Sequence, residues 1–131
     1  MDIKKIDFTF FENALLSLKE GLLNEPKNDL ERDGVIQRFE YTFEQCWKMI
    51  RRVLISLGKV DVSASPKPLF RDALQEGFLD DLDTWFRYLD ARNSTTHLYS
   101  KKDSDFVFSI IKDFPEYAEK LLSKLKEKGQ L

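Results

Sequence analysis

The chain has 131 residues, enough for one hydrophobic core, and we expect a single domain over residues 1–131. Its 21 basic and 23 acidic side chains nearly cancel, so any contact with RNA must come from a local patch rather than from the overall charge. The single cysteine, Cys46, excludes an internal disulfide, and neither a leader nor a long apolar run is present, so we expect a cytoplasmic, soluble protein without a membrane segment.

The first half of the chain predicts two helices from apolar residues spaced three and four positions apart. The first is expected over roughly residues 3–23 and ends before Pro26, which cannot continue the hydrogen-bond ladder. The second is expected over roughly residues 29–57, with Gly58 as its left-handed cap. Their apolar faces contain Ile6, Phe10, Phe11, Ala14, Leu15, Leu18 and Leu22, and then Ile36, Phe39, Phe43, Cys46, Trp47, Ile50, Leu54 and Leu57.

Two further helices are expected in the middle of the chain. A short one over roughly residues 66–76 opens at a proline, which is tolerated in a first helical turn, and ends at Gly77. The next, over roughly residues 80–93, starts with aspartates. Carboxylates in a first turn match the helix macrodipole, and we favour this interpretation over a metal site for Asp80, Asp81 and Asp83.

The last predicted helix covers roughly residues 104–127, with Asp103 or Ser104 as its cap and a bend at Pro115. No stretch alternates as a strand does, so we predict an all-α fold, an antiparallel four-helix bundle with an extra short helix. The chain has 11 Phe, 2 Trp and 4 Tyr, more large aromatic side chains than one small bundle easily buries. We therefore predict a homodimer that uses the wide apolar faces of the first two helices.

Polar residues that can perform chemistry gather where the fourth predicted helix ends. Arg92 and Asn93 fall on the next two positions of its apolar stripe, and His97, the only histidine, and Tyr99 follow closely. A guanidinium in such a stripe must be paired or face a cleft, because burying a bare charge costs several kcal/mol or more. The stripe itself contains Leu82, Trp85, Phe86 and Leu89.

Arg92 and His97 are suited to cleaving a phosphodiester without a metal. An imidazole with a pKa near neutral can move the proton of a ribose 2′-hydroxyl, and a guanidinium can stabilise the charge that grows on the phosphate. One histidine and one cysteine make no ordinary zinc site, so we expect no metal or other cofactor. The residues alone leave an alternative open, in which Arg92 ends a helix, His97 caps it, and Tyr99 is a half-buried core residue.

Two stretches of the chain resemble the HEPN family, which includes proteins named nucleotidyltransferase substrate-binding proteins. The stretches are Val35-Ile36-Gln37-Arg38-Phe39-Glu40-Tyr41-Thr42-Phe43-Glu44-Gln45-Cys46-Trp47-Lys48 and Arg92-Asn93-Ser94-Thr95-Thr96-His97-Leu98-Tyr99. The resemblance covers about residues 5–125. It implies an all-helical homodimer that is encoded beside a minimal nucleotidyltransferase partner, the two chains acting as toxin and antitoxin.

The resemblance also implies a role for each residue of the motif. The Arg-x4-His ribonuclease motif of the family corresponds to Arg92 and His97, with Asn93 as the polar residue beside the arginine. Here the motif extends to Arg-x4-His-x-Tyr. In similar proteins the partner transfers AMP to this tyrosine, here Tyr99, and so silences the toxin.

Two functions of different classes follow from these observations. The chain is either a metal-independent endoribonuclease toxin or a non-catalytic subunit that binds a nucleotide or another substrate for a nucleotidyltransferase partner. We favour the ribonuclease, because a binding subunit does not need a proton-transfer pair next to a phenol that can be modified. A third interpretation is a dimeric interaction module in which the motif only shapes the helix junction.

Overall fold

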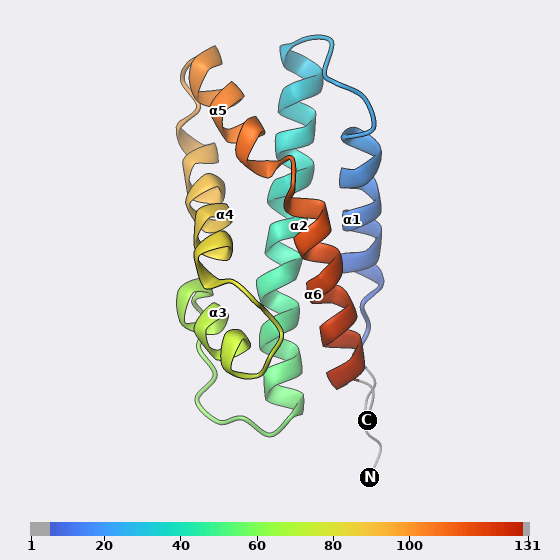
Figure 1. Ribbon diagram of the computed structural model, residues 1–131, viewed down its shortest axis with the longest axis vertical. Helices are drawn as coiled ribbons and strands as arrows, with labels where there is room; N and C mark the ends of the chain where they lie inside the picture. The colour runs from blue at the N-terminus through green and yellow to red at the C-terminus, as the bar shows by residue number, and fades with distance from the viewer. Residues whose placement is uncertain (1–5, 130–131) are drawn as a thin grey trace.

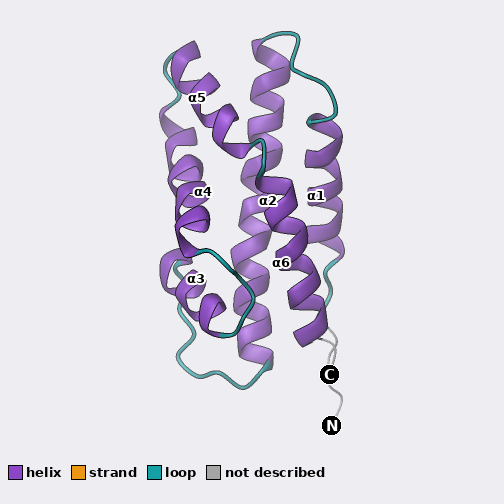
Figure 2. Ribbon diagram, in the orientation of Figure 1, coloured by secondary structure: helices purple, strands orange, loops and turns teal. Residues whose placement is uncertain are grey.

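The computed structural model describes residues 6–129 and contains only helices within that range (Figures 1 and 2). The elements are α1 (Thr9–Gly21), α2 (Asp29–Ser56), α3 (Pro66–Gln75), α4 (Leu82–Ser94), the 3-10 helix η1 (Thr95–His97), α5 (Lys101–Ile111) and α6 (Phe114–Gly129). α2 is central and contacts each of the other α-helices, with α1 on one side, α4 on the other and α6 in front in Figure 1. The predicted all-α bundle is therefore confirmed, with α3 as its extra short helix. None of the helices in the described range combines the length and the apolar character needed to cross a membrane.

α1 is shorter than the helix predicted at the start of the chain. It begins at Thr9, whose backbone N–H donates to the Asp7 carboxylate at 2.8 Å; the predicted residues 3–5 lie outside the described range. The expected burial of Phe10 is wrong, since its side chain is 74% exposed. A helix turns by about 100° per residue, which places Phe10 beside the face that α1 turns to the core. The buried residues of that face are Phe11, Leu15 and Leu18.

α2 begins and ends within one residue of the predicted segment. At its start, the Asn28 side chain accepts a hydrogen bond from the backbone N–H of Glu31 at 2.8 Å, an N-cap that satisfies one of the free amides of the first turn. After its end, Gly58 has φ +86°, the left-handed conformation that was predicted for it.

The last predicted helix is in fact two helices, α5 and α6, separated by a short turn. The predicted cap at Asp103 or Ser104 is also wrong, because Ser100 caps α5 by accepting the backbone N–H of Asp103 at 3.1 Å. Pro115 explains the break. A proline within a helix lacks an N–H and clashes with the carbonyl four residues earlier, here that of Ile111, where α5 ends.

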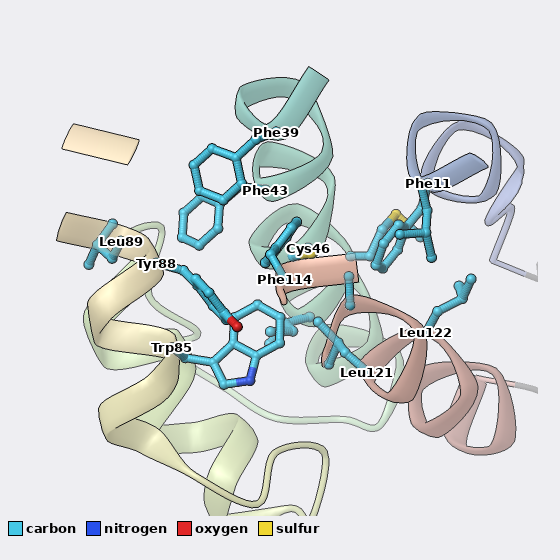
Figure 3. Close-up of a cluster of buried hydrophobic side chains, with 14 of the residues drawn as sticks. Phe11, Phe39, Phe43, Cys46, Trp85, Tyr88, Leu89, Phe114, Leu121 and Leu122 are labelled. Atoms are coloured by element: carbon cyan, nitrogen blue, oxygen red, sulfur yellow. The ribbon is translucent and has the colours of Figure 1, made fainter. Parts of the chain in front are cut away.

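The break directs Phe114, the first residue of α6, into the centre of the core (Figure 3). Its ring lies 4.9 Å from that of Phe39 and 6.2 Å from that of Phe43 on α2. It also lies 5.0 Å from Tyr88 and 5.9 Å from Trp85 on α4, between ring centroids. Phe114 is fully buried, so this aromatic cluster joins α2, α4 and α6.

The turn between α5 and α6 is also tied to α4 by polar contacts. The Tyr88 hydroxyl donates to one carboxylate oxygen of Asp113 at 2.8 Å, and Arg87 donates to the other at 3.2 Å. Burial raises the pKa of the Tyr88 phenol, and the hydrogen bond to Asp113 raises it further. Tyr88 lies one helical turn before Arg92, so its hydrogen bond to Asp113 holds in place the part of α4 that leads to Arg92.

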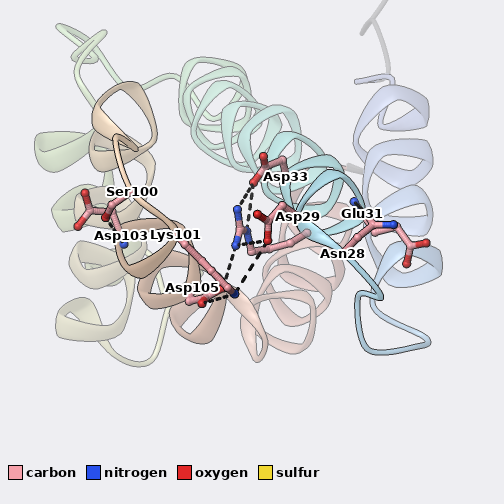
Figure 4. Close-up of polar contacts among 9 residues, drawn as sticks. Asn28, Asp29, Glu31, Asp33, Ser100, Lys101, Asp103 and Asp105 are labelled. Carbon is pink, nitrogen blue, oxygen red and sulfur yellow. Dashed lines mark hydrogen bonds and ion pairs between the residues drawn. The ribbon is translucent and has the colours of Figure 1, made fainter.

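A second polar cluster joins the start of α2 to α5 (Figure 4). The buried Arg32 guanidinium donates to Asp29 at 3.1 Å, to Asp33 at 3.0 Å and to Asp105 at 3.0 Å. Lys101 pairs with Asp105 at 3.0 Å. Three carboxylates thus compensate a guanidinium that is buried beneath α5.

Candidate functional site

The predicted site residues lie at the end of α4 and in the turn that leads to α5 (Figure 1). α4 begins after Asp81, whose carboxylate accepts the backbone N–H of Asp83 at 3.0 Å, so this aspartate is the helix cap. The pKa of Asp81 is lowered, first of all by the hydrogen bond that it accepts from the Thr84 hydroxyl. α4 ends at Ser94 and tightens into η1, which places Arg92 on regular helix and His97 at the end of a tight turn.

Arg92 is half-buried and turns toward α2. Its Nη1 donates to the Thr95 hydroxyl at 3.2 Å, and that hydroxyl donates to the Arg92 carbonyl at 2.7 Å. Its Nε lies 3.7 Å from Oε1 of Glu44, a carboxylate on α2. The charge in the apolar stripe is therefore paired, as burial of a guanidinium requires.

Asn93 does not share the environment of Arg92. The prediction that both residues continue the apolar stripe is wrong for Asn93, whose side chain is exposed. One residue along a helix is a rotation of about 100°, enough to move Asn93 from the core side of α4 to its flank. Its side chain makes no hydrogen bond to any residue from 6 to 129, and its carbonyl accepts the Thr96 hydroxyl at 3.1 Å.

His97 and Tyr99 contact each other on the surface. The His97 Nδ1 lies 3.2 Å from the Tyr99 hydroxyl oxygen, and the two ring centroids are 6.0 Å apart. Both side chains are exposed, and Tyr99 is 84% exposed. The alternative of a half-buried core tyrosine is therefore wrong for this chain, and its hydroxyl is accessible from solvent.

The structure brings the site residues together in two pairs rather than in one cluster. His97 contacts Tyr99, while Arg92 contacts Glu44 and Thr95, and no hydrogen bond within residues 6–129 joins Arg92 to His97. Glu44 was missed by sequence reasoning. It lies in a stretch that resembles the family, but its spacing carries no signal that it meets an arginine far along the chain.

Metal-ligating side chains do not gather at this site. Across residues 6–129, no group of three or more His, Cys, Asp or Glu side chains is arranged to hold a metal ion. Cys46 lies buried in α2, where burial raises the pKa of its thiol well above the usual value. The groups available for chemistry at the junction are thus the guanidinium, the imidazole, the phenol and the carboxylate of Glu44.

Known proteins share this fold and this sequence pattern. The family model described as nucleotidyltransferase substrate binding protein like matches residues 6–127. A curated relative, the probable ribonuclease HepT of Haemophilus influenzae, is 34% identical over 100 residues, which are 74% of this chain and 68% of the relative.

Two solved structures are similar over nearly their whole length. A crystal structure of a Thermus thermophilus protein has a TM-score of 0.81 and 35% identity, covering 88% of this chain and 98% of that chain. The Haemophilus influenzae protein HI0074 has a TM-score of 0.81 and 28% identity, covering 92% of this chain and 99% of that chain. Its structure is described as revealing the fold of a substrate binding domain of a nucleotidyltransferase.

The helical bundle and these matches define the class as a HEPN protein of the HepT-like type. The chain belongs to the family that is described as nucleotidyltransferase substrate binding protein like.

Proposed function

We propose that the chain is a metal-independent endoribonuclease, the toxin of a toxin–antitoxin pair that acts in the cytoplasm, with Arg92, Asn93 and His97 as its catalytic residues. The name of the Haemophilus influenzae relative, a probable ribonuclease, supports this activity. We further propose that a minimal nucleotidyltransferase partner silences the toxin by transferring AMP to Tyr99. The family description, which refers to nucleotidyltransferases, supports such a partner.

The contact between His97 and Tyr99 carries the proposal. When Nδ1–H of His97 donates to the Tyr99 oxygen at 3.2 Å, Nε2 keeps its lone pair and is free to act as a base. One side chain then performs proton transfer, and its neighbour is an exposed phenol that another enzyme can reach. Activity and its control are thus only two residues apart.

In the proposed reaction, Nε2 of His97 removes the proton of a ribose 2′-hydroxyl, and the 2′-oxygen attacks phosphorus. The 5′-oxygen leaves and takes a proton from the imidazolium or from water. The products carry a 2′,3′-cyclic phosphate, or a 3′-phosphate after its hydrolysis, and a 5′-hydroxyl. Arg92 stabilises the charge on the phosphate, and the exposed amide of Asn93 binds the RNA beside it.

Modification of Tyr99 inhibits this reaction locally. The Tyr99 oxygen attacks the α-phosphorus of ATP, pyrophosphate leaves, and the phenolic proton is released. The attached phosphate competes with the RNA phosphate for the Arg92 guanidinium, and the nucleoside covers His97. A change of conformation elsewhere in the bundle is not required.

We propose that the protein is a homodimer whose two motifs line a shared cleft. Large apolar side chains remain exposed on the outer faces of α1 and α2, among them Leu16 at 57% and Ile55 at 47%. The hydroxyls of Ser17 and Tyr41, 2.6 Å apart, join the two helices beside this surface. Glu44, the carboxylate that contacts Arg92, lies about one turn beyond Tyr41 on α2.

Cleavage of RNA by the purified, unmodified protein in EDTA tests the activity. We expect cyclic-phosphate or 3′-phosphate ends, and His97→Ala should abolish cutting while the far-ultraviolet circular dichroism stays unchanged. Arg71→Ala, which removes an exposed arginine on α3, is the matched control and should retain activity. A requirement for magnesium, or cutting that survives the change of His97, would refute the mechanism.

Mass spectrometry of the chain co-expressed with a neighbouring minimal nucleotidyltransferase tests the silencing. We expect one or more AMP units on Tyr99 and an escape of Tyr99→Phe from both modification and silencing. Tyr41→Phe is the control, since Tyr41 is 39% exposed and lies on α2, away from the motif. An unmodified chain held inactive in a tight complex would instead show that the partner acts by occlusion.

Size exclusion with light scattering at micromolar concentration tests the dimer, and a monomer mass would remove the shared cleft.

The second candidate function is a non-catalytic subunit that binds a nucleotide or another substrate for a nucleotidyltransferase. The description of the HI0074 fold as a substrate binding domain favours it. It predicts an unmodified chain that never cuts RNA but raises the affinity of the transferase for its substrate.

A further inference from the structure

Glu44 is the charged group that meets Arg92 from another helix. Its Oε1 lies 3.7 Å from Nε of Arg92, and the two side chains are 32% and 26% exposed. Lys48, one turn further along α2, lies 3.9 Å from the other carboxylate oxygen. The pair is thus half-buried and shielded from much of the solvent, where a charge contact is screened less than on an open surface.

The three nitrogen atoms of the Arg92 guanidinium differ in their partners. Nη1 donates to the Thr95 hydroxyl at 3.2 Å. Nε is buried and makes no hydrogen bond within residues 6–129, so the Glu44 carboxylate is the anion that faces it. Nη2 has no hydrogen-bond partner in the same range and is not among the fully buried unpaired atoms, so it is the guanidinium nitrogen left to meet a ligand.

We infer that Glu44, together with Thr95, is a positioning residue for Arg92 that fixes the plane of the guanidinium with Nη2 directed to an RNA phosphate. This inference rests on the proposed ribonuclease function. A guanidinium presents its donors in a rigid plane, so holding both Nε and Nη1 decides where the Nη2 donors point. A group held in the reactive geometry lowers the barrier, because its ordering is complete before the substrate reacts.

The charge of Glu44 makes its effect on binding opposite to its effect on turnover. A carboxylate beside the phosphate site repels RNA, so Glu44 does not improve affinity. Its contribution is expected in the rate of the chemical step. A residue that merely stabilised the fold would leave the rate of the chemical step unchanged, because a smaller folded fraction only raises the protein concentration needed for half-maximal cleavage.

Single-turnover cleavage of a short RNA in EDTA separates the two quantities. We expect Glu44→Gln to lower the maximal rate roughly 10- to 100-fold, in line with the cost of misplacing a catalytic group. The half-saturating protein concentration should stay the same or fall. Glu44→Asp, which keeps the charge, should recover part of the rate, and Thr95→Ser should exceed Thr95→Val.

Glu40→Gln is the matched control. Glu40 lies one turn before Glu44 on α2, is half-buried and forms no ion pair within residues 6–129, and its variant should cut at the wild-type rate. Thermal melts verify that each variant is folded. Equal rates for Glu44→Gln and Glu40→Gln, or a rate loss matched by weaker RNA binding, would overturn the inference.

A second readout does not depend on RNA cleavage. The 15N-labelled Nε–Hε group of Arg92, assigned by its loss in Arg92→Lys, should give a sharp, slowly exchanging signal that broadens or vanishes in Glu44→Gln. An unchanged signal refutes the positioning role. If the wild-type protein does not cut RNA, the proposed function fails, while this signal still decides whether Glu44 orients Arg92.

Discussion

Phe114→Ala tests whether the break between α5 and α6 is the structural centre of the bundle. Phe114 is fully buried, and its ring lies within 6.2 Å of four other aromatic rings, contributed by α2 and α4. Truncating a buried phenylalanine costs about 3–5 kcal/mol, and each aromatic pair adds about 0.5–1.5 kcal/mol beyond area burial. We therefore expect the upper part of that range.

Such a loss is a large share of a typical domain stability of about 5–15 kcal/mol. It corresponds to a decrease in the melting temperature of roughly 10–20 °C for a chain of this size. Urea unfolding followed by tryptophan fluorescence is a suitable assay, because Trp85 lies 5.9 Å from Phe114. Protein concentration must be held constant, since self-association would shift the apparent stability.

Phe106→Ala is the control for this measurement. Phe106 is also a phenylalanine, but it lies on α5 and is 66% exposed. Its truncation should therefore change the free energy of unfolding by less than about 0.5 kcal/mol. If both variants lost equal stability, the argument that the break inserts Phe114 into the core would be refuted. The loss in Phe114→Ala should also reduce the ribonuclease activity, since Tyr88 joins this cluster to α4 one turn before Arg92.

Three further predictions concern a turn, the thiol and an acidic side chain. Gly58→Ala should destabilise the protein by about 1 kcal/mol in thermal melts, because φ is +86° there and an L residue is strained in that region. Cys46 should resist a thiol reagent at pH 8 until urea unfolds the chain, because burial raises the pKa of its thiol and covers it completely; fast reaction of the native protein would contradict this. Hydrogen bonds from Lys101 and then Arg32 lower the pKa of Asp105. The folded pKa is below the unfolded one, so the stabilisation is present above about pH 4 and is lost as the pH falls through the folded pKa. The difference in melting temperature between wild type and Asp105→Asn should therefore be largest near neutral pH and vanish in strong acid.

The sequence by itself determined the features that depend only on residues close together in the chain. Apolar spacing defined α2 nearly to the residue, because periodicity of 3.6 is a property of one helix and needs no partner. Proline at its start and Gly77 after its end defined α3 equally closely. The left-handed conformation of Gly58 followed from local backbone sterics. The motif from Arg92 to Tyr99 was visible for the same reason, since its residues are close in the chain.

Only the tertiary structure decided which faces meet. Pro115 marked an irregularity, but the division into α5 and α6 depends on the space for Phe114 between α2 and α4. The exposure of Phe10 depends on which side of α1 faces α2 and α6. Periodicity indicates that a residue lies on an apolar face, but it contains no information about what packs against that face. Glu44 and Arg92 lie on two helices that are far apart in the chain. Their contact therefore exists only after the bundle has formed, and the sequence alone could not indicate it.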